Sequence, residues 1–400
     1  MSTNIVKINE KWLKWARTSV KYEKEEVASK LNVNPEKITE WEETGELTQN
    51  ELIDLSNVYE VSPYTFFDSN DPVYDENIHD FRTINSKKIK ITPEIMFELR
   101  RAKENRDTLL NFEDDFDDFE FPLFSLNTVD SDNPVIVAKQ IRHLLNMSRS
   151  NSHRKLDYWI NLIESLGILV FEFYNIKPEQ LRGYALYYDK LPIIGINHKE
   201  SNNAKKFTLF HELAHLIMEK DGISNINEYF LNNDEAYCNK VAAEVLLPND
   251  LFKKYVEDNS TYKKFRPQDI KGLSQIFNVS KQVIVRKALD LRFISHNDYN
   301  KRINEFNEYI NPPKKNNFNK KDNKPQSKKE NEARDSDKGL HNKAKIALRK
   351  NGNYFTSLLI KAYEEDLITD VAMALELNVS LQVMSKIISI MVEEDLYVFV

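Results

Sequence analysis

Apolar residues over residues 10–68 recur at the spacing of short helices. "EKWLKWARTSV" places its apolar side chains on one helix face, and "EKEEVASKLNVNPEKITEWEE" reads as two helices separated by the break "NVNP". Pro35 suits the first turn of the helix after that break. Short helices joined by tight turns are typical of a helix-turn-helix module. We therefore expect a five-helix module of this kind over residues 1–70.

The middle of the chain mixes helical and strand-like patterns. "PEIMFELRRAKENRDTLLNF" predicts a long helix, and the acidic, aromatic "FEDDFDDFEFPLF" a solvated loop or docking strip, so residues 71–130 form a connecting region. Two helices are expected over 134–165, followed by the strands "ILVFEFYN" and "LRGYALYYDKLPIIGIN". The helices "NAKKFTLFHELAHLIMEK" and "NDEAYCNKVAAEVLLP" come next. Strands followed by helices predict an α+β domain with a small sheet over residues 131–310.

The last part of the chain begins with a change of composition. Residues 314–329 contain seven lysines and one aspartate, and residues 311–338 hold almost no apolar side chains, which predicts a disordered linker. Residues 339–400 read as a C-terminal helical module, so the fold class is α+β and predominantly helical. A weak repeat, "VASKLNV", "LSQIFNV" and "MALELNV", either starts a helix-turn-helix pair three times or is a common turn between packed helices.

Composition narrows the class of protein. The 400 residues suggest about two to four domains, and the net charge of −7 argues against nucleic-acid binding by the chain as a whole. Cys238 is the single cysteine, which rules out an intrachain disulfide and fits a reducing compartment. Neither a signal peptide nor an apolar run long enough for a membrane span is visible. We expect a soluble, cytoplasmic protein.

The stretch "FTLFHELAHLIM" carries the clearest chemistry. His211 and His215 are four residues apart, so one helix face presents both, and imidazole is a favoured zinc ligand. Glu212 has the position of the general base in the HExxH arrangement. Zinc lowers the pKa of a bound water towards 7, and Glu212 would take a proton as that water attacks a carbonyl. The alternative is a core helix with two hydrogen-bonded histidines, but burying these groups without a use is costly.

A third zinc ligand is expected from the next helix. Glu235 and Glu244 are both candidates, and because they are nine positions apart on a helix only one can face the metal. Glu235 shares the apolar stripe of Cys238, which favours it. Cys238 itself could face the metal or be a buried apolar residue.

These motifs resemble the ImmA/IrrE family of zinc metallopeptidases. The resemblance is carried by "KKFTLFHELAHLIM" and "EAYCNKVAAEVLLP", and is strongest over 180–295. It places the ligand glutamate on Glu235, the family asparagine on Asn239 and the closing proline on Pro248, whereas Val241 stands where the family has phenylalanine. The front module, "DFRT" at 80–83 and the C-terminal helices also resemble longer members of the family.

The resemblance implies a zincin-like core, a Zn²⁺ cofactor and proteolysis of a helix-turn-helix repressor, with derepression as the outcome. An alternative is a DNA-binding regulator or antitoxin-like protein whose metal site is structural or sensory. Because a structural zinc would not need Glu212, that residue favours the enzyme.

Other candidate residues rest on weaker patterns. Lys24, Lys37 and Thr39 would contact DNA in a repressor-type module, but residues 1–70 hold eight basic and thirteen acidic residues, a net charge of −5. Tyr184 and His198 could stabilise an oxyanion or bind substrate. Lys205 and Lys206 are expected to form a solvated turn at the start of the helix that carries His211 and His215.

Overall fold

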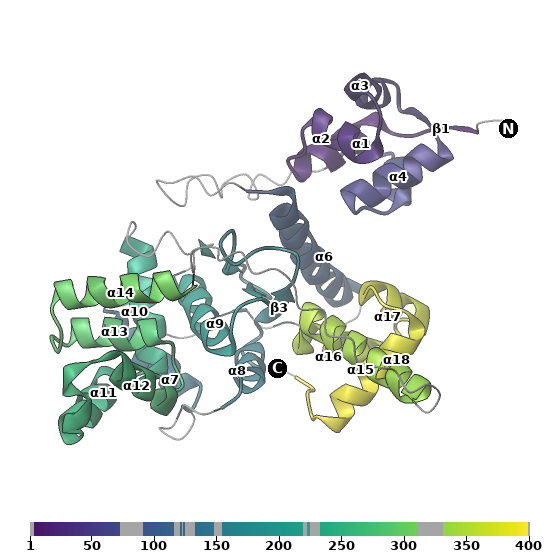
Figure 1. Ribbon diagram of the computed structural model, residues 1–400. Coiled ribbons are helices and arrows are strands. Elements are labelled where there is room, and N and C mark those ends of the chain that lie inside the picture. The colour runs from purple at the N-terminus through teal and green to yellow at the C-terminus, as the bar shows by residue number, and fades with distance from the viewer. Residues whose placement is uncertain are drawn as a thin grey trace. The chain divides into compact units, whose positions relative to one another are not determined.

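The computed structural model describes residues 4–72, 91–115, 121, 123–124, 133–147, 154–218, 222–224, 233–310 and 331–398. Helices dominate these residues, and their strands form two small sheets (Figure 1). The predicted α+β, predominantly helical fold is therefore confirmed. The "DFRT" stretch and residues 311–330 of the predicted linker lie outside the described residues.

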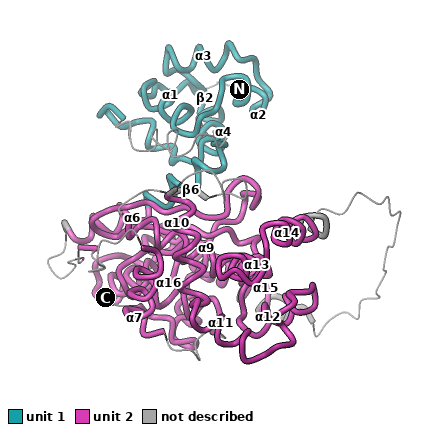
Figure 2. The backbone as a smooth tube through the Cα atoms, turned by 90° about the vertical axis from the view of Figure 1, so that its left-hand side faces the viewer, with its two compact units in different colours: residues 1–104 teal, residues 105–400 magenta. Residues whose placement is uncertain are grey.

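The chain divides into two compact units, residues 1–104 and 105–400 (Figure 2). The elements of the first unit are β1 (Ile5–Lys7), α1 (Glu10–Ser19), α2 (Lys24–Leu31), α3 (Pro35–Thr44), β2 (Glu46–Thr48), α4 (Gln49–Tyr59), the 3-10 helix η1 (Pro63–Phe67) and the start of α6 (Pro93–Asp115). In place of a fifth α-helix before residue 70, the structure has η1, and β1 pairs antiparallel with β2. Trp41, Tyr59 and Phe66 fill its core.

The weak repeat produces the same turn three times in the described residues. Asn32, Asn278 and Asn378 each end a helix in the left-handed conformation, with φ of 54°, 52° and 52°. Asparagine tolerates this conformation better than most residues. Asn34, Ser280 and Ser380 then cap the next helix.

The second unit is built around a four-stranded sheet. Its elements up to the last strand are α7 (Pro134–Leu144), α8 (Leu156–Glu164), β3 (Leu169–Phe173), β4 (Gly183–Leu186), β5 (Ile193–Asn197), α9 (Asn202–Ile217) and β6 (Gly222–Ser224). The strand order is β3-β5-β4-β6, with β3 parallel to β5 and β4 antiparallel to both of its neighbours. Ala185, Ile194 and Ile196 share one core cluster with apolar residues of α9 and α10 (Asn233–Leu246).

Helices complete the second unit. They are α11 (Asn249–Asp258), the 3-10 helix η5 (Ser260–Lys264), α12 (Pro267–Phe277), α13 (Lys281–Asp290), α14 (His296–Ile310), α15 (Asn331–Asn351), α16 (Asn353–Glu364), α17 (Asp370–Glu376) and α18 (Leu381–Glu393). Because α15 begins at Asn331, the last eight residues of the predicted linker are helical.

The C-terminal helices pack against the edge strand of this sheet. Both α15 and α16 contact β3, and the rings of Phe171 and Phe355 meet edge to face at 6.4 Å. The backbone N–H of Tyr354 donates to Glu164 at the end of α8. These helices therefore belong to the same packed unit as the sheet.

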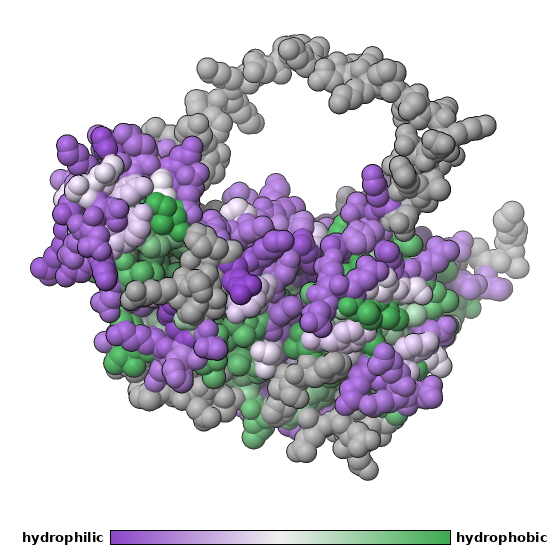
Figure 3. Space-filling view, turned by 90° about the horizontal axis from the view of Figure 1, so that it is seen from below, coloured by the Kyte–Doolittle hydropathy of each residue, from purple (hydrophilic) through white to green (hydrophobic). Residues whose placement is uncertain are grey.

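Hydrophilic side chains cover most of the face seen in Figure 3, with smaller hydrophobic patches between them. None of the described helices is by itself long and apolar enough to span a membrane, and only α17 and α18 taken together, bent by 85°, pass that test of length and composition.

Candidate metal centre

A cluster of two histidines and one glutamate lies between α9 and α10. His211 and His215 come from successive turns of α9, and Glu235 from the first turn of α10. The two Nε2 atoms are 3.2 Å apart, and each lies 3.1 Å from a carboxylate oxygen of Glu235. All three side chains are buried. The structure thus brings together the three residues that the sequence suggested as ligands.

The donor set fits a metal ion. These ligand atoms lie within 4.8 Å of one another. Tetrahedral zinc with ligands at about 2.0–2.2 Å separates them by about 3.3–3.5 Å, so a small outward movement of the side chains would complete the fit. Within the described ranges the cluster has two imidazoles and one carboxylate, which is the number of protein ligands found in catalytic zinc sites.

The electrostatics of the cluster favour a cation. Burial alone would raise the pKa of Glu235, but the imidazoles of His211 and His215 hold it well below its ordinary value. Burial would lower the pKa of His215, yet Cys238 and the carboxylates of Glu235 and Glu212 raise it. Glu235 therefore stays ionised, and the site can exchange bound protons for a metal ion.

Glu212 lies on the same helix and is fully buried. Its negative charge is one of the influences that raise the pKa of His215. Glu212 is not one of the three residues whose donor atoms cluster in the described part of the chain.

Glu244, the alternative ligand, has a different partner. Its carboxylate pairs with the buried ammonium of Lys287 on α13 and accepts the backbone N–H of Asn249 at 2.9 Å. Nine positions from Glu235, it faces α13 instead of the histidines, as the helical phase predicts.

Cys238 contacts the cluster without belonging to the donor set. It is fully buried, its Sγ lies 3.7 Å from Sδ of Met218, and its interaction with His215 raises the pKa of that imidazole. Burial raises the pKa of the thiol itself. The sequence offered a choice between a metal-facing thiol and a buried apolar residue, and the structure shows a buried thiol in contact with a histidine.

The structure does not support the two proposed oxyanion residues. Gly183 on β4 faces α9, because a Cβ there would meet Thr208 and Glu212. Tyr184 is the next residue of the strand, so its side chain points to the opposite face of the sheet. It is buried there, with its ring stacked on Phe173 and lying over Gly195. This prediction is wrong because strand alternation sends Tyr184 to the opposite face of the sheet. His198 directs Nδ1 to Glu172 at 2.9 Å and stacks on Tyr174, so its described contacts are with β3 and the residue after it.

The lysines at the start of α9 are not solvated, contrary to the expectation from sequence. Lys205 and Lys206 are both buried, and Lys205 Nζ pairs with Glu172 Oε1 at 3.1 Å. Glu172 therefore joins β3 to the zinc helix. Sequence reasoning missed this carboxylate because its partner lies more than thirty positions away, and only the charge inside the strand pattern "ILVFEFYN" hinted at it.

The three candidate DNA contacts of the first unit are engaged by neighbours. Lys24 Nζ donates to Thr39 Oγ1 at 2.9 Å and lies 3.5 Å from Glu42. Lys37 pairs with Glu40 at 3.0 Å. The outer side of α3 also exposes Glu36 and Glu43, so its surface is mainly acidic.

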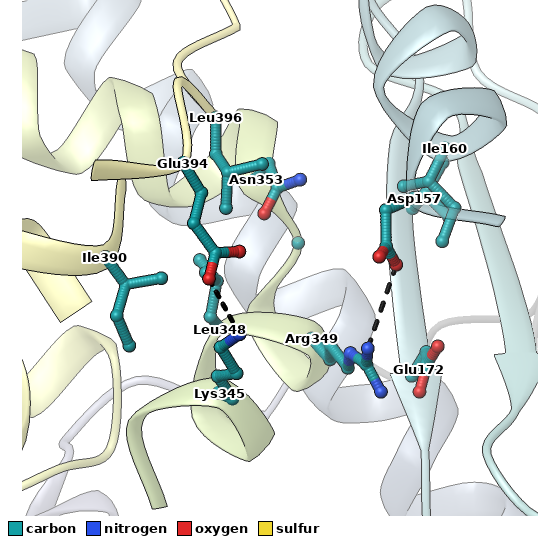
Figure 4. A pocket seen from close by; sticks show the side chains of 12 residues that line it. Asp157, Ile160, Glu172, Lys345, Leu348, Arg349, Asn353, Ile390, Glu394 and Leu396 are labelled. Atoms are coloured by element: carbon teal, nitrogen blue, oxygen red, sulfur yellow. Dashed lines mark ion pairs between the residues drawn. The ribbon is translucent and has the colours of Figure 1, made fainter. Parts of the chain in front are cut away.

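A separate pocket of about 80 Å³ lies where the C-terminal helices meet α8 and β3 (Figure 4). Lys345 pairs with Glu394 across one side, and Arg349 lies 3.8 Å from Asp157 on the other. The histidine cluster does not line this pocket.

Comparison with known proteins agrees with this site. Residues 163–289 match the Peptidase_M78 family model, described as the IrrE N-terminal-like domain. No curated protein matches the chain. The matched segment contains β3, the whole of α9 and α10, and the histidine cluster. The match supports the relation to the ImmA/IrrE family that the motifs indicate, and with it a metallopeptidase-like function.

Proposed function

We propose that this protein is a zinc-dependent endopeptidase. His211, His215 and Glu235 would hold the ion, and the fourth position would be open to water and substrate. Zinc bound there would lower the pKa of a water molecule towards 7 and polarise the scissile carbonyl. The observation that carries the proposal is the buried cluster of His211, His215 and Glu235, three donors among the described residues, with the buried Glu212 next to His211 in the sequence.

Glu212 would transfer the protons of the reaction. Its carboxylate would accept a proton from the attacking water, as a general base, and would then donate it to the leaving amine, as a general acid. Because the surrounding side chains are buried, its charge acts in a poorly screened environment. A purely structural zinc site usually has four protein ligands and needs no such carboxylate.

Metal content and hydrolysis together test this assignment. We expect purified protein to bind about one zinc per chain. His211→Ala should lose the metal, whereas Glu212→Gln should keep it and lose hydrolysis. Loss of metal in Glu212→Gln would show that ligand and base have been exchanged in the proposal.

We further propose that the substrate is a basic helix-turn-helix repressor cleaved in trans, which would relieve repression. The family resemblance supports this substrate, as does the acidic outer side of α3, which suits a basic protein better than DNA. The strip from Glu113 to Glu120 gives less support than the sequence suggested. Glu113 already pairs with Lys190 at 2.6 Å, and residues 116–120 lie outside the described ranges.

The substrate is tested by incubating zinc-loaded protein with the repressor encoded beside it, using Glu212→Gln as the control. Cleavage by the parent chain alone supports the proposal. A repressor that stays intact under every activating condition would favour the second candidate, a transcriptional regulator whose metal site is sensory or structural. Zinc binding without hydrolysis would separate that regulator from the enzyme.

A further inference from the structure

Gly183 lies in a row of residues that crosses the sheet beneath α9. In the strand register, Glu172 of β3 pairs with Ile196 of β5, and Ile196 pairs with Gly183 of β4. Residues opposite one another in register point to the same face. The row therefore presents a carboxylate, an isoleucine and a glycine to the zinc helix.

α9 meets this row with one of its own faces. Lys205, Thr208 and Glu212 are three and then four residues apart, so they share a side of the helix. Lys205 binds Glu172 at one end of the row. Further along the row, a Cβ on Gly183 would lie 2.4 Å from Thr208 Cγ2, 2.7 Å from Glu212 Oε1 and 3.0 Å from the carbonyl oxygen of Gly195. The carboxylate of Glu212 thus occupies the space that any other residue at 183 would fill.

Backbone conformation does not explain this glycine. Gly45, Gly167 and Gly352 have positive φ, but Gly183 does not. Glycine inside a strand costs stability relative to residues with side chains. What requires it here is the close approach of α9.

The three crowded atoms differ in how easily they can move. The Gly195 oxygen belongs to the backbone of β5, and Thr208 is held by the hydrogen bond from its Oγ1 to Glu200 at 3.0 Å. The Glu212 carboxylate is the end of a flexible side chain. A methyl group at 183 would therefore force the Glu212 carboxylate to move, together with the methyl group of Thr208.

We propose that Gly183 is a positioning residue that leaves room for the Glu212 carboxylate at its working position. This inference rests on the proposed peptidase function, in which Glu212 is the proton acceptor. Gly183 would thus have a role in the reaction although it has no side chain and although β4 contributes none of the three metal ligands.

The test separates crowding of Thr208 from crowding of Glu212. Thr208→Ser removes Cγ2 but keeps the hydroxyl, so it serves as the reference background for Gly183→Ala/Thr208→Ser. Gly339→Ala, where an added Cβ meets nothing within 4 Å, controls for the glycine-to-alanine change itself. For each protein we would measure the melting temperature, metal content, kcat and KM, and the pH dependence of the visible spectrum after cobalt(II) substitution.

The double variant should melt near its background and bind about one metal per chain, because the three ligands are unchanged. Its kcat should fall about 10²-fold, the lower range for loss of general base catalysis, with little change in KM. The pH at the midpoint of the spectral change of its cobalt(II) form should shift towards the value found for Glu212→Gln.

Two results would overturn the proposal. One is a double variant with the kcat and cobalt profile of Thr208→Ser, since Gly183 would then only accommodate the Thr208 methyl group. The other is a double variant that loses metal and stability together, since Gly183 would then only support the fold. The cobalt profile decides the question even if no substrate is cleaved, and a parent chain that binds no metal would refute the peptidase site itself through the metal analysis.

Discussion

At the scale of single residues, two glutamates on one helix have different roles because their side chains face different neighbours. Glu235 and Glu244 are both buried on α10. The first faces two imidazoles and the second faces a lysine ammonium. Removing either carboxylate should therefore change a different property of the protein.

We expect Glu235→Ala to weaken zinc binding by more than the ~10–100-fold that loss of an outer-sphere partner costs. Glu244→Ala should leave zinc binding nearly unchanged but lower the free energy of unfolding by about 3–5 kcal/mol, because Lys287 becomes a buried, unpaired charge. Zinc titration and chemical denaturation of both variants test this. The reverse ranking of zinc affinities would refute the assignment of Glu235.

Local spacing predicted His211, Glu212 and His215, because the i, i+4 relation within one helix does not depend on the rest of the fold. It could not predict Glu172, Lys205 or Gly183, whose roles arise from contacts between a strand and a helix. Tyr184 was misplaced for the same reason, since the strand's two faces could not be told apart before α9 was positioned.

At the scale of elements, a buried carboxylate joins α8 to α16. Glu164 Oε1 accepts the backbone N–H of Tyr354 at 3.1 Å. Burial raises the pKa of Glu164 to about 8, although the backbone N–H groups of Tyr354, Asn353 and Val170 act in the opposite direction. The junction therefore favours the protonated acid.

This shift predicts a pH-dependent stability. Between pH 4.5 and about 8 the folded chain keeps a proton on Glu164 that the unfolded chain has released. The free energy of unfolding should then fall as pH rises through this window, by up to about 1.4 kcal/mol per pH unit from this group. Glu164→Gln should flatten the dependence, which melting curves from pH 5 to 9 would show. An equally steep dependence in the variant would contradict the role of Glu164.

The helix pair α2 and α3 has the turn expected from sequence, but its surface chemistry does not favour DNA. Lys24 and Lys37 are paired, and glutamates line the outer side of α3. We expect the full chain to bind duplex DNA with a Kd weaker than about 10⁻⁶ M at physiological salt, the range of non-specific binding. A gel-shift assay tests this, and tight sequence-specific binding would refute it.

At the scale of the whole molecule, the C-terminal helices are part of the packed unit that holds the metal centre. The sequence predicted a separate module because the lysine-rich segment interrupts the hydrophobic pattern, and pattern alone carries no information about which surface the later helices cover. The rings of Phe171 and Phe355 are buried against each other across this junction.

A chain ending at Glu330 should therefore be less stable and prone to association, because it exposes the apolar edge strand β3. Phe355→Ala should lower the free energy of unfolding by about 3–5 kcal/mol. The exposed Leu375 provides the control, since Leu375→Ala should change stability by no more than about 0.5 kcal/mol. Thermal denaturation and light scattering measure both effects. A truncated chain that melts like the parent and stays monodisperse would contradict this view.

Because α15 and α16 pack against β3 and come much later in the sequence, the sheet is completed late during synthesis of the chain. β3 leaves the ribosome about 180 residues before Phe355 does. At a translation rate of about 5–20 residues per second, this delay is roughly ten to forty seconds. Before that interval ends, every residue of the histidine cluster has been made, but one edge of the sheet beside it is still bare. The nascent chain thus carries the ligands of its metal centre before it carries the helices that close the sheet, and chaperones or zinc can reach it in that interval.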